Sequence, residues 1–207
     1  MALITGAHAA PTTPPDPIVL AQEQLAQIAA YQCRIDSRSA QGDRTLMRYS
    51  YRKPGYVRMD FTEPHHGAVL IYAPDSAKVR VWPFGMGTLP VLSLSPSNSL
   101  VQGPNGHRVD RSDVGTLLRN IRQLQQGGKT TVIGKESLAE QTVLHLSILG
   151  AAGVSIDGVH HYEVWLEDRH GFPIKVVSYN SGDREMETVV MNALVFNPHF
   201  PADFFTP

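Results

Sequence analysis

The chain has 207 residues and a mass of 22.7 kDa, enough for one domain with a continuous apolar core and no disulfides. Eighteen Lys and Arg against 19 Asp and Glu give a formal net charge of −1, and no basic cluster stands out along the chain. This balance argues against a nucleic-acid-binding protein. The 17 Gly and 15 Pro residues fall between short apolar runs, which favours many strands joined by turns.

The single cysteine, Cys33, excludes an intramolecular disulfide and any CxxC metal or redox motif. No run of apolar residues is long enough for a transmembrane segment. Residues 1–15 carry small residues around Ala7 and Ala10, followed by a Pro-rich stretch. We expect them to form a disordered tail, either a simple tail or the remnant of a secretion signal plus linker. Residues 16–207 are expected to form a single domain.

The first predicted element is a helix. Asp16 is a suitable N-cap and Pro17 a suitable first helical residue, and the apolar face continues to about Ala30. The period then changes to two. Strands are predicted at 44–52 and 57–61, and the Pro54-Gly55 turn between them indicates an antiparallel hairpin.

Further strands are predicted at 67–73, 78–82 and 91–95. A second helix follows from Val114 to Leu124, where apolar residues recur at helical spacing and Gly127 ends the pattern. The remaining apolar runs predict strands, and these are 130–133, 142–149, 160–167, 172–179 and 184–196.

Consecutive strands with short turns pair antiparallel, and ten or eleven such strands are too many for a flat sheet. We therefore predict an α+β protein dominated by antiparallel β structure. Its sheet should form a curved, incompletely closed β-barrel covered by two or more helices.

Signatures of catalysis are missing from the sequence. It contains no phosphate-binding loop, no G-x-S-x-G elbow and no H-E-x-x-H motif. The pairs His65-His66 and His160-His161 lie on strands or turns, where neighbouring side chains point to opposite faces and cannot chelate one metal ion. A metal site would need His from separate strands, together with Glu163 or Asp168. We expect no catalytic residues, no metal and no cofactor.

Met and aromatic side chains recur on the predicted strands, and such side chains adapt to variable apolar ligands. They either fill the core or line a ligand cavity. The cavity candidates are Met47, Tyr49, Tyr51, Met59, Phe61, Tyr72, Trp82 and Trp165. Arg44, Arg48 and Arg52 share the opposite face of one strand, and we interpret them as a solvated row with cross-strand partners.

The segment from Pro83 to His107 is rich in Gly and Pro and cannot pair continuously in a sheet. It is predicted either to be an ordinary surface loop or a flap over the barrel mouth. In the second case Phe84, Met86 and Leu89 would be its apolar anchors.

Several short motifs resemble the bacterial LolA/LolB superfamily of lipoprotein carriers. They include Tyr51-Arg-Lys-Pro-Gly-Tyr-Val-Arg-Met-Asp-Phe-Thr-Glu-Pro64, the strands 67–72 and 78–82, and Trp165-Leu-Glu-Asp168 followed by Phe172-Pro-Ile-Lys175. The closing Phe196-Asn-Pro198 and Asp203-Phe-Phe205 are also similar to that family. The resemblance spans roughly residues 17–205.

This resemblance implies an unclosed antiparallel barrel with a helical lid, located in the periplasm of a bacterial envelope, that binds acyl chains without catalytic residues or cofactors. In the carrier proper, an Arg precedes the Pro of the first hairpin and takes part in closing the lid. Lys53 stands at that position here, and a Lys cannot reproduce the planar fork of an Arg in such a latch.

Three hypotheses follow. The leading one is an exported, non-enzymatic binding protein that holds a lipid or acylated protein ligand in the apolar interior. The second is a regulatory module of the envelope that uses a sheet edge or residues 83–107 to contact a protein partner. The third, a metal-dependent enzyme, has the least support.

Overall fold

The computed structural model describes residues 14–103 and 106–206, so the predicted tail lies almost entirely outside the described residues. In this part of the chain, eleven strands form one antiparallel sheet. The elements are α1 (Pro17–Gln27), β1 (Ala30–Ser39), β2 (Arg44–Arg52), β3 (Tyr56–Glu63), β4 (Val69–Ala73), β5 (Lys78–Trp82), β6 (Leu92–Leu94), the 3₁₀ helices η1 (Ser99–Val101) and η3 (Val109–Arg111), α2 (Val114–Gln125), β7 (Lys129–Leu138), β8 (Gln141–Leu149), β9 (His161–Glu167), β10 (Pro173–Tyr179) and β11 (Glu185–Phe196).

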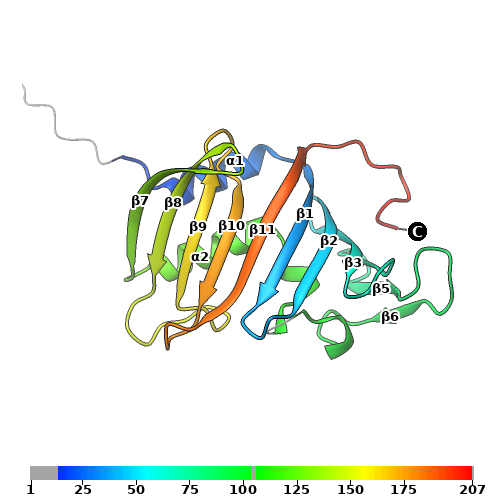
Figure 1. Cartoon of the computed structure of the whole chain (residues 1–207). Coiled ribbons are helices and arrows are strands. Elements are labelled where there is room, and N and C mark those ends of the chain that lie inside the picture. Colours follow the sequence, from blue (N-terminus) through cyan, green and yellow to red (C-terminus); the bar gives the residue numbers. More distant parts are fainter. Residues whose placement is uncertain (1–13, 104–105, 207) are drawn as a thin grey trace, which may run out of the picture.

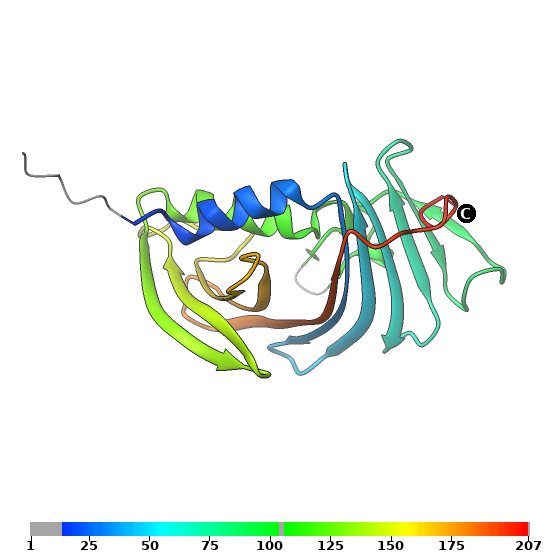
Figure 2. The ribbon, with the colours of Figure 1, turned by 90° about the horizontal axis from the view of Figure 1, so that it is seen from above.

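The strand order is β6-β5-β4-β3-β2-β1-β11-β10-β9-β8-β7, with β1 and β11 at the centre (Figure 1). The chain starts in the middle of the sheet, runs outward to the β6 edge, crosses over through α2 and returns from the β7 edge. The two edges do not pair, so the sheet curves without closing (Figure 2). The predicted α+β fold with a curved, open barrel is confirmed.

Both helices lie side by side on the concave side of the sheet (Figure 2). Asp16 caps α1 by accepting a hydrogen bond from the amide of Ile18 at 2.8 Å. A second oxygen of Asp16 accepts from Nη1 of Arg122 in α2, also at 2.8 Å, which ties the two helices together. Helix α1 ends at Gln27, before the predicted Ala30, because Ile28 is extended and Ala30 already pairs with β2.

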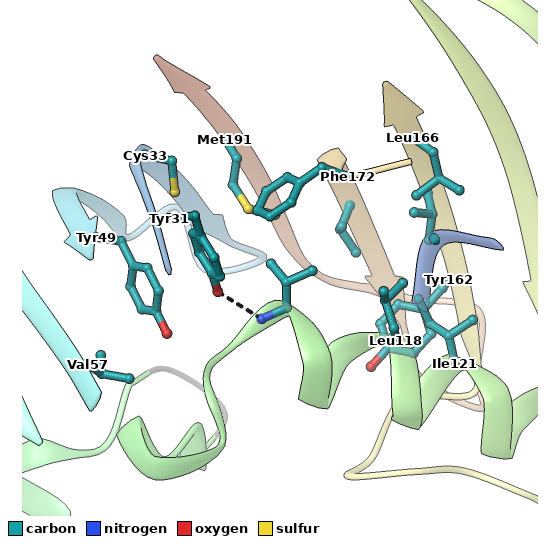
Figure 3. Packing of buried hydrophobic residues seen from close by; sticks show 14 of the residues in the cluster. Tyr31, Cys33, Tyr49, Val57, Leu118, Ile121, Tyr162, Leu166, Phe172 and Met191 are labelled. Atoms are coloured by element: carbon teal, nitrogen blue, oxygen red, sulfur yellow. Dashed lines mark hydrogen bonds between the residues drawn. The ribbon is translucent and has the colours of Figure 1, made fainter. Parts of the chain in front are cut away.

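The main core fills the space between these helices and the concave face. Leu118 and Ile121 of α2 are fully buried there (Figure 3), and so is Leu146 of β8. The β9–β10 turn approaches α1 closely at Gly171, where a Cβ atom would lie 3.2 Å from the Cα of Ala21. Gly171 also has a φ of +62°, so glycine suits this turn for two reasons.

The outer face of the sheet carries two smaller apolar clusters. The residues that follow β11 fold back over β3–β5, where Phe205 is buried against Val69, Ile71 and Trp82. On the other half of the sheet, Trp165 packs with Val143, Ile174 and Val177. Both faces of the sheet are therefore partly apolar.

Candidate ligand cavity

A cavity of about 800 Å³ lies between the concave face of β1–β5 and the segment that leads into α2. Residues 106–113, which we call the cover segment, and the first turns of α2 form one wall. Strands β9–β11 contribute the far wall through Tyr162, Val176 and Met191. The cavity therefore lies at the N-terminal end of α2, and no residue of α1 lines it.

The floor of the cavity is apolar. Each contributing strand presents alternate residues to it, since side chains along a strand alternate between the two faces. The apolar side chains of the floor are Cys33, Ile35, Met47, Met59, Phe61, Leu70, Val81, Leu92, Val189 and Met191. Of the predicted candidates, Met47, Tyr49, Met59 and Phe61 line this cavity; their role in ligand binding stays a proposal.

Tyr51 and Tyr72 lie on the concave side but outside the cavity lining. Both pack against the main core as partly buried side chains. The ring of Tyr51 stacks on Tyr31, with centroids 5.1 Å apart. Tyr51 thus packs against Tyr31, which lines the cavity.

The positions of Trp82 and Trp165 correct the expectation that they face the cavity. Both belong to the clusters on the outer face of the sheet. Trp165 is sandwiched there by the ring of His145, 4.1 Å away between centroids, and by the ammonium of Lys175, 4.1 Å from its ring. Because the outer face is also apolar, alternation along a strand does not show which of its sides faces the cavity.

The connection between β5 and β6 also differs from the predicted flap. The side chains of Phe84 and Leu89 are 72% and 84% exposed, and Met86 is exposed as well. None of the three lines the cavity, so they do not anchor a flap over its mouth. The same region contributes Pro83, Leu92 and Val101 to the cavity wall instead.

Lys53 contacts α1. Its Nζ donates to the carbonyl oxygen of Ala26 at 2.7 Å and to that of Leu25 at 3.3 Å. These carbonyls belong to the last turn of the helix, where free acceptors and the helix dipole favour a cation. Lys53 thus fastens the β2–β3 hairpin to α1, while α1 itself lies outside the cavity lining.

One end of the cavity is polar. The hydroxyl of Ser37 in β1 donates to Oε1 of Glu187 in β11, and Nε2 of His107 in the cover segment lies 3.2 Å from Oε2 of the same carboxylate. Burial alone would raise the pKa of Glu187, but the bonds from His107 and Ser37 outweigh it and lower that pKa. The hydrogen bond to Glu187 in turn raises the pKa of His107.

The wall near the start of α2 is held by tyrosines. The hydroxyls of Tyr49 and Ser112 lie 3.1 Å apart, and that of Ser112 donates to the carbonyl of Val109 at 2.8 Å. Tyr31 stacks on Tyr49 and accepts from the amide of Val114 (Figure 3). Burial raises the pKa of Tyr49 and of Tyr31, so both remain neutral hydrogen-bonding groups.

Cys33 is 1% exposed on the cavity floor, and burial raises the pKa of its thiol to about 12. Its thiol is therefore a small, neutral side chain of the floor. The predicted cross-strand partners of the basic row are also present. Arg44 binds both oxygens of Asp36, at 2.9 and 2.7 Å, and Arg48 lies 3.7 Å from Asp60.

Histidines gather on the outer face of β8 and β9. His145 and His161 both contact the carboxylate of Glu163, and the remaining ring nitrogen of His145 bonds to Glu136 at 2.7 Å. Within residues 14–103 and 106–206, no group of three or more His, Cys, Asp and Glu has the arrangement of a metal site. The carboxylates serve these histidines as hydrogen-bond partners.

Neither helix formed by the described residues has the length and apolar character that a bilayer crossing requires.

The sequence carries a signal for the polar end of the cavity. Glu187 lies in phase with Val189 and Met191 along β11, and Ser37 is in phase with Cys33 and Ile35 along β1. A charged residue at the inward phase of an otherwise apolar strand face is unusual, because burying a charge is unfavourable unless it is paired.

Neither a family model nor a curated protein matches the chain. Solved structures do match. The Mycobacterium tuberculosis lipoprotein LppX is 10% identical over 90% of this chain and 96% of its own, with a TM-score of 0.53. MucB is 15% identical over 92% of this chain, with a TM-score of 0.52, and the chain spans 61% of it. A LolA superfamily protein from Nitrosomonas europaea is 13% identical over 92% of this chain and 96% of its own, with a TM-score of 0.38. The TM-scores above 0.5 show that the chain shares its fold with LppX and MucB.

Proposed function

We propose that this protein is a non-enzymatic binding protein of the bacterial envelope that holds a lipid or an acylated protein in its cavity. The observation that carries the proposal is a cavity of about 800 Å³ with an apolar floor inside a LolA-like half-barrel. Its volume is in the range of sites that enclose small organic ligands.

The residues on the floor support an acyl chain as the ligand. Met47 and Met59 have flexible, polarizable side chains that repack around variable apolar groups. Phe61 adds a flat aromatic surface next to them. Each methylene group that moves from water onto such a floor contributes about 0.8 kcal/mol. Affinity should therefore rise with chain length until the cavity is full.

Native mass spectrometry of protein purified without detergent tests this function directly. We expect a co-purified acyl ligand, or uptake of an added lipopeptide or fatty acid ester. Met47→Trp fills part of the cavity and should reduce uptake at least about tenfold, because the displaced methylenes lose their apolar contacts. Met86→Trp is the matched control, since Met86 is exposed on the β5–β6 connection outside the cavity.

A protein that takes up no acyl ligand while its fold is intact would contradict the proposal. Stable capture of an envelope protein after removal of all lipid would instead favour the regulatory module. MucB supports keeping this alternative, because it is also known in complex with MucA. Location in the envelope is part of the proposal and is tested by cell fractionation.

A further inference from the structure

The polar end of the cavity holds a partly buried carboxylate. The side chain of Glu187 is 13% exposed and lies on the same face of β11 as the cavity residues Val189 and Met191. It stays ionised because Ser37 and His107 both bond to it. A ligand whose chain lies on the apolar floor would place its polar head group either at this polar end or at the opening of the cavity to solvent.

The arginines near the cavity are already neutralised by carboxylates. Arg44 is the first residue of β2 and lies at the edge of the cavity. Its guanidinium binds Asp36 and also Glu63, the latter at 3.3 Å. Its guanidinium is therefore directed at carboxylates of the sheet and is not free for a ligand.

The two arginines of the cover segment are paired as well. Arg108 forms a two-point contact with Asp110, at 3.0 and 2.7 Å, and Arg111 lies 3.8 Å from Asp157. Asp43 also lies along the cavity wall. Among the described residues, the cavity lining holds three carboxylates, Asp43, Asp113 and Glu187, and three guanidinium groups, and each of these guanidinium groups is paired with a carboxylate outside the lining.

We propose that the cavity selects acyl ligands with a neutral or cationic head group over those with an anionic one, and that Glu187 sets this preference. The inference rests on the proposed function and names its ligand class. These ligands are acyl esters, acyl amides and long-chain amines, as opposed to free fatty acids.

Two physical effects produce the selection. Like charges inside a cavity of low polarity are screened less than in bulk water, so a ligand carboxylate near Glu187 is repelled. A hydroxyl, amide or ammonium group can instead donate a hydrogen bond to the Glu187 carboxylate, which still has free lone pairs.

Three ligands with one chain length isolate the effect of head-group charge: laurate, 1-monolauroylglycerol and dodecylamine. Binding is measured by isothermal titration calorimetry at pH 8, below the micellar concentrations. For the native protein we expect laurate to bind at least about tenfold more weakly than the other two, as for an unpaired charge placed beside a like charge. The same series is repeated with Glu187→Gln.

Removing the charge of Glu187 should narrow the gap between laurate and 1-monolauroylglycerol to about threefold or less. Glu185→Gln is the matched control, because Glu185 is an exposed residue of the same strand outside the cavity, and it should leave the gap unchanged. Thermal unfolding of both variants checks that the fold is retained.

Laurate binding as tightly as 1-monolauroylglycerol to the native protein would overturn the inference while leaving the proposed function intact. So would a gap that persists in the folded Glu187→Gln variant. Failure of all three ligands to bind would overturn the proposed function and the inference together. If Glu187→Gln does not fold, the titrations of the three ligands into the native protein still decide whether the cavity discriminates against an anionic head group.

Discussion

The hydroxyl of Tyr31 accepts a hydrogen bond from the backbone amide of Val114 at 3.1 Å, in the buried interior between β1 and the first residue of α2. The amide of a first helical residue has no partner within its own helix. The tyrosine thus satisfies a donor that would otherwise be buried alone, and it fixes the start of α2 against the centre of the sheet.

Tyr31→Phe should lower the free energy of unfolding by about 1–3 kcal/mol, because it leaves that amide unpaired. Urea unfolding followed by circular dichroism measures the change. Tyr51→Phe is the control, since it removes a hydroxyl from the ring stacked on Tyr31 without touching the Val114 amide. Equal losses for the two variants would mean that the hydrogen bond contributes nothing specific.

Lys53→Met should loosen the end of α1. The loss of the contacts from Nζ to the carbonyls of Leu25 and Ala26 should cost about 0.3–1 kcal/mol, the usual value of a cation near a helix C-terminus. Hydrogen exchange should speed up in the last turn of α1 relative to β4. Lys78→Met, on an exposed position of β5, should show neither change. Unaltered hydrogen exchange in α1 would contradict the idea that Lys53 stabilises the end of this helix.

The pair of His107 and Glu187 should make stability depend on pH. The pKa of His107 is raised above its ordinary 6.5 by Glu187, so its contribution is complete below 6.5 and is lost as the pH rises through the folded value. The pKa of Glu187 is lowered from 4.5, so its contribution is complete above 4.5 and is lost in more acidic solution. Both contributions are complete between these values.

His107→Gln should therefore destabilise the protein more at pH 6 than at pH 8.5. The difference should stay below about 1 kcal/mol, because His107 is 48% exposed and solvent screens the pair. Ser37 bonds to the same carboxylate, and Asp157 also raises the pKa of His107. Both residues are unchanged in the His107→Gln variant. A destabilisation that is the same at both pH values would show that His107 acts without its charge.

Cys33 should report on the integrity of the cavity. With a pKa of about 12, its thiol is almost entirely protonated near pH 8. Alkylation by iodoacetamide should be at least about a hundredfold slower in the folded protein than in denaturant, since the thiolate is the reactive form. Rapid labelling of the folded protein would mean that solvent reaches the cavity floor freely.

The order of helices and strands followed from local patterns in the sequence. The hairpin at Pro54-Gly55, the capped helix that begins at Val114 and the alternation in β2 and β3 each depend on neighbouring residues only. The inward face of a strand does not. Trp82 lies on the outer face, where Phe205, from a part of the chain far away in sequence, covers it. Alternation alone cannot show such cover.

The sequence predicts that an interior cavity exists, but not all of the residues that line it. An open half-barrel with adaptable side chains suggests an interior site, and Met47, Tyr49, Met59 and Phe61 lie there. The polar end does not follow from periodicity, because His107 reaches Glu187 from the irregular cover segment. The exposure of Phe84 and Leu89 likewise depends on the path of an irregular connection.

The ladder between β1 and β11 has a consequence for how the chain acquires this shape. Every other pair of neighbouring strands is consecutive in sequence, so each half of the sheet is a meander that can assemble from local hairpins. Only β1 and β11 must find each other from opposite ends of the chain, at the loop-closure cost that such a distance carries. The wall of the cavity that combines Cys33 with Met191 therefore exists only after the two halves have joined, and the nascent chain has no complete cavity until β11 is made.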